Sequence, residues 1–207
     1  MGWWSEQVVP RVNDKTLSGK PVMALRTQIC AGLSGRVLEL GFGSGLNLDA
    51  YPPEVTAVDA VEPSDVGWRL SEARRARASV PVERVGLTGE RIDVPDASYD
   101  AVLATFTLCT IPDVRAALAE VRRVLRPGGT VHVLEHGLAP SRRVADWQRR
   151  LEPMQRRLAG GCHLTRDVPA LLTEAGLEID RLDQAYLPGP GISKPWGYGS
   201  QVVAHKP

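Results

Sequence analysis

A glycine cluster directly follows a short apolar segment near position 40. Residues 36–40 run into Gly41-Phe-Gly-Ser-Gly45. Glycine lets a backbone approach a ligand closely because it carries no Cβ. A dinucleotide fingerprint would need a further glycine where Leu46 stands. Glu39, two positions before the cluster, disfavours a pyrophosphate and favours a ligand with a cationic group.

A second carboxylate, Glu62, stands at the end of another apolar, β-branched segment. It follows residues 55–61 and precedes Pro63. A carboxylate about 20 positions after a glycine turn can accept hydrogen bonds from the ribose hydroxyls of a bound nucleoside. Asp59 is a competitor for this role, but it lies earlier in the segment, so we rank it below Glu62.

Two further motifs lie next to β-type segments. Thr88-Gly-Glu90 follows one such segment, where a backbone N–H and a polar side chain can contact the edge of an adenine ring. Leu125-Arg-Pro-Gly-Gly129 precedes another, at 130–135.

These motifs need a frame of alternating strands and helices to position them. Residues 64–79 and 113–125 have the composition or spacing of helices, with Asp113 as a cap. We also expect a helix directly after the glycine turn, mostly helical structure at 139–175, and a long Pro/Gly-rich loop at 187–199. The alternation implies a largely parallel sheet covered on both faces. The predicted strands are 36–40, 55–61, 82–85, 99–105, 130–135, 177–182 and 201–204.

The overall composition is that of one globular domain. The 207 residues are 43% hydrophobic and 24% charged. With a net charge of only +1, the protein has no strong positive potential to attract the phosphate backbone of a nucleic acid, so we expect no nucleic-acid partner. No apolar run approaches the ~20 residues that span a bilayer, and there is no signal-peptide pattern, so we expect a cytoplasmic protein. The oligomeric state is not readable.

The ordered motifs resemble those of a known family. The order Glu-x-Gly-x-Gly-x-Gly, Glu-Pro, Gly-Glu, Ser-Tyr-Asp and Leu-Arg-Pro-Gly-Gly is similar to class I methyltransferases of the methyltransferase type 11 kind, which use S-adenosylmethionine (SAM). The match covers about residues 35–135. Residues 105–110, 134–136 and 161–166, together with Trp147, resemble the alkyl-thiol S-methyltransferase branch of this family.

This resemblance implies a Rossmann-like, three-layer α/β sandwich, with a mostly parallel seven-stranded sheet between helices on both faces. It implies SAM as the cofactor and no metal. Thr88 stands where the family commonly has Asp, which implies either a weaker adenine contact or one made by Glu90 alone. The expected cofactor-binding residues are Glu39, Gly41, Phe42, Gly43, Gly45, Glu62, Pro63, Gly89, Glu90, Thr105 and Phe106.

The resemblance also implies methyl transfer to a small-molecule acceptor, with a thiol as first choice. SAM is already a strong methyl donor, so the enzyme mainly aligns the acceptor and excludes water. A free thiol has a pKa of about 8.5, so modest help produces the reactive thiolate. We expect His136, with His163 as a second candidate, to deprotonate or orient the acceptor, although a structural role is open for both. The alternatives are O- or N-methylation of a quinone or natural product, and a SAM-binding regulator without catalysis.

The cysteines give no independent signal. Cys30, Cys109 and Cys162 are odd in number and widely spaced, which indicates neither a disulfide framework nor a Cys-x-x-Cys metal site. Cys162 and His163 are adjacent, but no further Cys or His lies close in sequence, so we expect no metal there. Cys109 is interpreted as a packing residue.

Two segments remain for the acceptor side of the site. We expect residues 1–34 to form an N-terminal helical lid or cap, and residues 35–207 to form the methyltransferase domain with a helical insertion at about 139–175. Trp3 and Trp4 either cover the substrate or anchor an N-terminal helix. The loop at 187–199 is a candidate for shaping the acceptor pocket.

Overall fold

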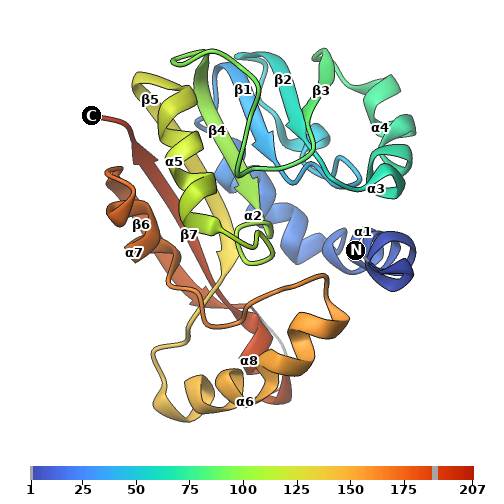
Figure 1. Cartoon of the computed structure of the whole chain (residues 1–207), viewed down its shortest axis with the longest axis vertical. Helices are drawn as coiled ribbons and strands as arrows, with labels where there is room; N and C mark the ends of the chain where they lie inside the picture. Colours follow the sequence, from blue (N-terminus) through green and yellow to red (C-terminus); the bar gives the residue numbers. More distant parts are fainter. Residues whose placement is uncertain (1, 188–190) are drawn as a thin grey trace.

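Seven strands form one sheet in the order β3-β2-β1-β4-β5-β7-β6 (Figure 1). The structure is a computed structural model, and it describes residues 2–187 and 191–207. The strands are β1 (Gly35–Leu40), β2 (Val55–Val61), β3 (Val82–Gly86), β4 (Tyr99–Thr105), β5 (Leu125–His136), β6 (Glu178–Tyr186) and β7 (Tyr198–His205).

The sheet is mixed. The pairings among β1 to β5 are parallel, as predicted, whereas β7 pairs antiparallel with both β5 and β6. The prediction of a mostly parallel sheet therefore holds for the first five strands and needs correction at the β7 edge. Antiparallel neighbours need no crossover between the faces of the sheet, and β6 is joined to β7 by residues 187–197, which include α8.

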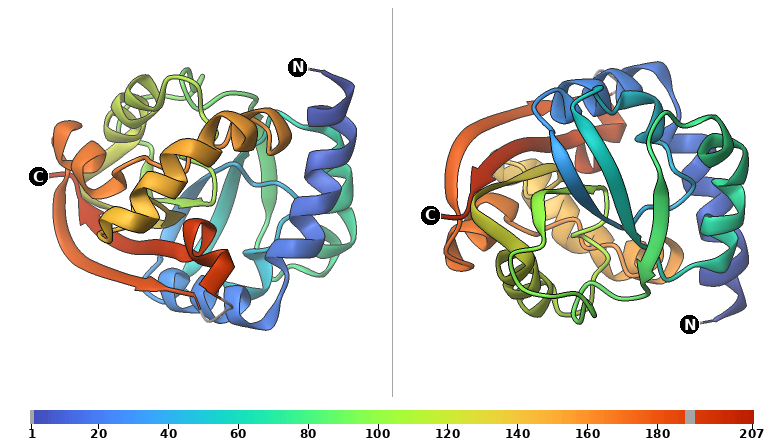
Figure 2. Two further views of the ribbon diagram at one scale, coloured as in Figure 1. Left: turned by 90° about the horizontal axis from the view of Figure 1, so that it is seen from below. Right: turned by 90° about the horizontal axis from the view of Figure 1, so that it is seen from above.

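Helices cover both faces of the sheet (Figures 1 and 2). Successive strand residues point to opposite faces, so Val102 of β4 belongs to one apolar core and Leu103 to the other. The first core includes side chains of α5 and α7, and the second includes Ile29 of α2. The helices are α1 (Val9–Leu17), α2 (Lys20–Cys30), α3 (Asp65–Leu70), α4 (Glu72–Arg77), α5 (Val114–Val124), α6 (Arg142–Leu158), α7 (Val168–Glu174) and α8 (Lys194–Gly197), with helical turns at Trp4–Val8, Leu48–Ala50 and Gly191–Ser193.

The helix expected directly after the glycine turn does not form. A single helical turn, Leu48–Ala50, stands there instead. Asn47, just before it, directs its side chain to Glu39 and Thr105, and Pro52 and Pro53 follow closely. A regular helix is disfavoured here because Asn47 is held by polar contacts across the fold and because the two prolines lack the backbone N–H that a helix needs.

Two other predictions need correction. The helix expected at 64–79 is divided into α3 and α4 at Ser71, whose hydroxyl donates to the carbonyl of Trp68 and competes with the helical ladder. The loop expected at 187–199 contains α8, and β7 begins at Tyr198 rather than at residue 201. Residues 188–190 of that loop lie outside the described residues.

The N-terminal prolines start helices rather than interrupt them. Pro10 lies in the first turn of α1 and Pro21 in the first turn of α2, where a missing N–H costs nothing. Asp113 caps α5 as predicted, because its carboxylate accepts from the backbone N–H of Ala116 at 3.0 Å. Among the described residues, no helix is both long enough and apolar enough to cross a membrane.

Candidate functional site

A cavity of about 780 Å³ lies at the carboxyl ends of β1, β2 and β4. Its wall combines the glycine turn, the residues after β2 and β4, the first helices and the segment after α6. Two of the expected cofactor residues, Glu39 and Gly45, are not part of the wall. The other expected residues line it: Gly41, Phe42, Gly43, Glu62, Pro63, Gly89, Glu90, Thr105 and Phe106.

The glycine turn is held against the segment after β4. Gly41 has φ +67°, and a Cβ added there would lie 2.1 Å from the hydroxyl oxygen of Thr107. Gly43 has φ +56° but open space around a Cβ, with the nearest atom at 3.9 Å. At position 41, both the left-handed backbone and the close Thr107 side chain require glycine. At position 43 only the left-handed backbone requires glycine, and the absence of a side chain leaves this backbone open to the cavity.

Glu62 links the glycine turn to the start of α3. One carboxylate oxygen accepts from the N–H of Gly43 at 2.6 Å, and the other accepts from the N–H of Ser64 at 2.7 Å. Burial raises the pKa of Glu62, and these two N–H groups act in the opposite direction. Each oxygen keeps a lone pair for a ligand. Asp59, the competitor, binds Arg36 and Tyr99 and is not part of the cavity wall.

Glu39 lies behind the cavity wall. It is buried, and it accepts hydrogen bonds from the Asn47 amide at 2.7 Å and from the Tyr51 hydroxyl. Burial raises the pKa of Glu39 to about 7, against the opposing effects of Tyr51 and Asn47. Asn47 also donates to the Thr105 hydroxyl at 3.0 Å, so Glu39 is coupled to the cavity through this amide.

Arg26 is a cavity residue that the sequence analysis missed. This α2 side chain is buried and donates to Asn47 at 2.8 Å and to the Thr105 hydroxyl at 2.6 Å. Its Nε has no hydrogen-bond partner among the described residues. Burial lowers the pKa of Arg26, and Glu39 opposes this effect. An arginine within a mixed N-terminal segment carries no spacing signal that distinguishes it from a surface charge.

The segments after β3 and β4 complete this side of the wall. Gly89 is buried, Glu90 is partly exposed, and the Glu90 carboxylate accepts from the Thr88 hydroxyl. Phe106 is a non-glycine residue in the left-handed region, with φ +53°, directly after β4. Such backbone conformations cluster at ligand sites, because the surrounding structure must hold them in place.

The N-terminal helices and the segment after α6 meet over the cavity (Figure 2). The Trp4 indole donates to the carbonyl of Leu158 at 2.9 Å. Asp14 of α1, which lines the cavity, forms an ion pair with Arg74 at 2.9 Å. Trp3 is 71% exposed and is not part of the wall. For Trp4 these contacts favour the anchor interpretation over the cover interpretation.

The two expected catalytic histidines lie outside the cavity wall. His163 has Nδ1 3.2 Å from the Glu152 carboxylate. His136, at the end of β5, has Nε2 3.0 Å from the sulfur of Cys162. The role of either histidine in deprotonating the acceptor stays a prediction.

His136 belongs to a buried cluster that spacing along the chain did not reveal. The ligand atoms of Cys109, His136 and Cys162 all lie within 4.8 Å of one another. The three residues come from the segment after β4, the end of β5 and the segment after α6. We call this set the Cys-His-Cys cluster. Glu135 adjoins it, because its carboxylate accepts from the backbone N–H of Cys109 at 3.2 Å.

Within this cluster the thiols and the imidazole shift each other's titration. Hydrogen bonding from Cys109 and from His136 lowers the pKa of Cys162 to about 4, although burial opposes it. Burial lowers the pKa of His136, but the contact with Cys162 and the charge of Glu135 outweigh it and raise the pKa to about 9. The contact with Cys162 and burial raise the pKa of Cys109.

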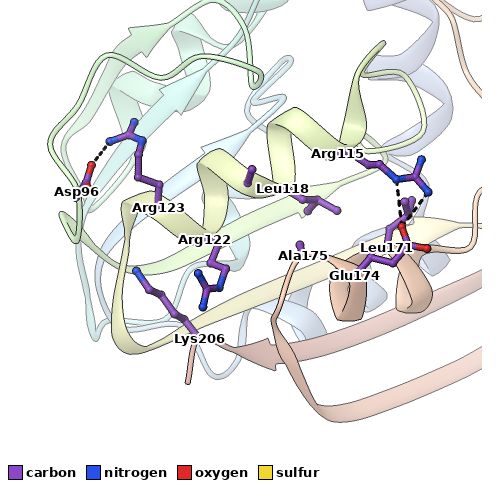
Figure 3. Close-up of a pocket in the computed structure, with 10 residues that line it drawn as sticks. Asp96, Arg115, Leu118, Arg122, Arg123, Leu171, Glu174, Ala175 and Lys206 are labelled. Carbon is purple, nitrogen blue, oxygen red and sulfur yellow. Dashed lines mark hydrogen bonds and ion pairs between the residues drawn. The ribbon is translucent and has the colours of Figure 1, made fainter.

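A second cavity, of about 670 Å³, lies between α5 and α7 (Figure 3). Its basic side chains already have partners: Arg123 pairs with Asp96 and Arg115 pairs with Glu174. None of the expected site residues line it. We therefore take the first cavity as the functional site.

Comparison with known proteins found a matching family model and several sequence relatives. A model of the methyltransferase domain matches residues 38–133. Thiol S-methyltransferase TMT1B of Rattus norvegicus is 37% identical over 167 residues, which cover 75% of this chain and 68% of that protein. Thiol S-methyltransferase TMT1A of Homo sapiens is 34% identical over 182 residues, which cover 85% of this chain and 74% of that protein.

The fold also matches that of solved methyltransferases. The N-methyltransferase NodS from Bradyrhizobium japonicum WM9, solved in complex with S-adenosyl-L-homocysteine, superposes with a TM-score of 0.71. The superposition covers 98% of this chain and 94% of the NodS chain, at 14% sequence identity. This likeness concerns the fold, whereas the sequence relatives identify the family. The chain therefore belongs to the class I SAM-dependent methyltransferases, in the branch of the thiol S-methyltransferases.

Proposed function

We propose that this enzyme transfers the methyl group of SAM to the sulfur of a small thiol, with both substrates bound in the 780 Å³ cavity. The observation that carries the proposal is the convergence of nine expected cofactor residues on this one cavity. The thiol acceptor is supported by the two relatives described above, whose names specify thiol S-methylation.

The residues of the wall fit SAM. Glu62 would hold the ribose, because each of its oxygens keeps a lone pair beside the bonds from Gly43 and Ser64. The open backbone from Gly41 to Gly43 would receive the amino-acid part. Gly89 and Glu90 would contact the adenine, and Pro63, Thr105 and Phe106 would complete the wall around the nucleoside and the methyl group.

Arg26 adds a contact that the family motifs did not supply. SAM carries a carboxylate, and a buried guanidinium that lines the cavity is its natural partner in a charge-assisted hydrogen bond. Glu39 would act on the SAM ammonium indirectly, through Asn47, since it lies behind the wall.

The chain's contribution to the reaction is alignment and exclusion of water. When bound, SAM supplies an activated methyl group, whose bond to the sulfonium breaks as the acceptor sulfur bonds to the methyl carbon. Residues 1–34 would act as the lid, because α1 and the turn before it line the cavity together with Ala159, Gly160 and Gly161, which follow α6 within the 139–175 insertion. Holding the acceptor in line in a closed site accounts for most of the rate enhancement that such a transfer needs.

An acceptor comparison tests the proposal. Hexanethiol, hexanol and hexylamine share one carbon chain and differ in the reacting atom, so they report preference for sulfur, oxygen or nitrogen directly. We expect methyl hexyl sulfide, detected by mass spectrometry, and no methylated product from the other two. Preferred methylation of the alcohol or the amine would replace the thiol assignment. SAM binding with no methylated product from a wide acceptor panel would indicate a regulator instead.

A further inference from the structure

The Cys-His-Cys cluster brings the donor types of a zinc site together in the protein interior. Two thiols and one imidazole have their ligand atoms within 4.8 Å of one another, and the His136–Cys162 pair is at 3.0 Å. A tetrahedral zinc ion, with Zn–S near 2.3 Å and Zn–N near 2.0 Å, needs its ligand atoms roughly 3.5–3.8 Å apart. Side-chain rotations of small amplitude convert the observed spacing into that geometry.

We propose that Cys109, His136 and Cys162 bind one zinc ion, or a similar borderline-soft divalent cation. Thiolate and imidazole are the ligands that such ions prefer. Glu135 is a candidate for the fourth position: it lies outside the group of ligand atoms within 4.8 Å, but one of its oxygens lies 3.7 Å from His136 Nε2 and the other accepts from the N–H of Cys109.

The charge balance of the cluster supports a bound cation. Glu135 and Cys109 are 1% and 3% exposed, and a buried carboxylate beside two thiols is costly unless a cation compensates it. Within the described part of the chain, the ion pair of Glu135 is with His136, while the charges of Arg26 and Arg166 act on Glu135 from a greater distance. Arg166, the nearby basic side chain, donates to the carbonyls of Leu108 and Ile111.

The two ring nitrogens of His136 differ in their contacts. His136 contacts Cys162 through Nε2, whereas Nδ1 is buried with no hydrogen-bond partner among the described residues. The assignment gives His136 the role of a metal ligand in place of the proton-transfer role expected from the sequence.

The site lies behind the part of the cavity wall that Thr110 and Gly161 form. Thr110 and Gly161, the chain neighbours of Cys109 and Cys162, line the cavity, while the three ligands do not. A bound ion would join the end of β5 to the segments after β4 and after α6. The ion would hold in place the part of the cavity wall that contains Thr110 and Gly161.

Metal content of the full-length protein tests the assignment. The protein is kept reduced, loaded with zinc chloride, freed of excess metal by gel filtration, and measured for zinc per chain by mass spectrometry. We expect one zinc per chain in the wild type, and loss of zinc in Cys162→Ser and in His136→Gln. Cys30→Ser and His163→Gln are matched controls that retain zinc, since neither residue belongs to the cluster.

Cobalt loading gives a second readout that needs no variant. Cobalt(II) bound to two thiolates gives sulfur-to-cobalt charge-transfer absorption together with intense tetrahedral d–d bands, and zinc should displace it. SAM binding and circular dichroism identify the variants that fold. Wild-type protein that retains no zinc, a cobalt spectrum without thiolate bands, or equal zinc in wild type and a folded Cys162→Ser protein would each overturn the proposal.

Discussion

Two buried carboxylates at the site differ in what they face. Glu62 lines the cavity and is bound by two backbone N–H groups, whereas Glu39 is sealed behind the wall by Asn47 and Tyr51. Both have a raised pKa because burial disfavours the charged form. Only Glu62 is placed to contact a ligand, so Glu39 is expected to affect stability more directly than binding.

The raised pKa of Glu39 makes folding stability depend on pH. In the folded protein its pKa is about 7, against 4.5 for an exposed glutamate, so the folded state binds more protons between these values. Stability contributed by the neutral form is fully present below pH 4.5 and is lost as the pH rises towards 7. A shift of this size corresponds to about 3 kcal/mol.

Glu39→Gln should remove this dependence. Urea unfolding across the same pH range is expected to show a smaller fall in the free energy of unfolding for the variant than for the wild type. The difference between the two proteins reports Glu39 together with its charge interaction with Glu62. Equal slopes for the two proteins would show that Glu39 titrates near its ordinary pKa.

The glycines of the turn should differ in their tolerance of a side chain. Gly43→Ala costs about 1–2 kcal/mol for a left-handed alanine. Gly41→Ala adds the overlap with Thr107, so it should cost at least about 1 kcal/mol more. The free energy of unfolding in urea measures both variants. A Gly41→Ala protein as stable as Gly43→Ala would mean that Thr107 does not press against the turn.

At the scale of the elements, α2 brings Arg26 from the N-terminal segment into the cavity. This placement predicts a selective effect on ligands that carry a carboxylate. Arg26→Met should weaken SAM binding roughly 10- to 100-fold, the value of a charge-assisted hydrogen bond. Binding of 5′-methylthioadenosine, which lacks the amino-acid part, should change little. Calorimetric titration measures both ligands.

The same variant also removes the bonds of Arg26 to Asn47 and Thr105. A merely structural role for Arg26 would therefore weaken SAM and 5′-methylthioadenosine by the same factor. Equal losses for the two ligands would exclude a contact between Arg26 and the SAM carboxylate.

The elements that could be predicted from the sequence are those with strong local patterns. The β-branched runs at 55–61 and 99–105 gave the bounds of β2 and β4 as the structure has them, and Asp113 marked the start of α5. The helix after the glycine turn was wrong because Asn47 binds across the fold to Glu39 and Thr105. Local propensity cannot report a partner that is distant in sequence.

The residues of the candidate site also fall into those that could be predicted from the sequence and those that could not. Motifs at strand ends, such as Gly41 to Gly43 and Glu62, could be predicted because local sequence fixes where a strand ends. Arg26 and the Cys-His-Cys cluster could not, because their members are brought together by packing between elements far apart in the chain. Spacing rules for metal sites apply to ligands on one or two neighbouring segments, whereas these three come from separate segments.

At the scale of the whole molecule, the cavity is enclosed by two parts of the fold: the strand ends of the sheet line one side, and α1 with the segment after α6 lines the other. Trp4 and Leu158 contact each other beside the cavity. On the proposed function, substrate choice would depend on segments outside the common sheet motifs. Solved structures that share this fold at under a quarter sequence identity can differ in their acceptors.

Calorimetric titration with SAM tests the central claim, that this cavity is the SAM site, most directly. The wild type, Glu62→Gln and Glu83→Gln are compared, with NADH as a second ligand. Glu83 is an exposed glutamate on β3 outside the cavity wall, so its variant makes the same charge change without touching the site. The account predicts SAM binding by the wild type and Glu83→Gln, a loss of roughly tenfold or more in Glu62→Gln, and no binding of NADH. Folded wild-type protein that does not bind SAM, or a Glu62→Gln variant with unchanged affinity, would contradict it.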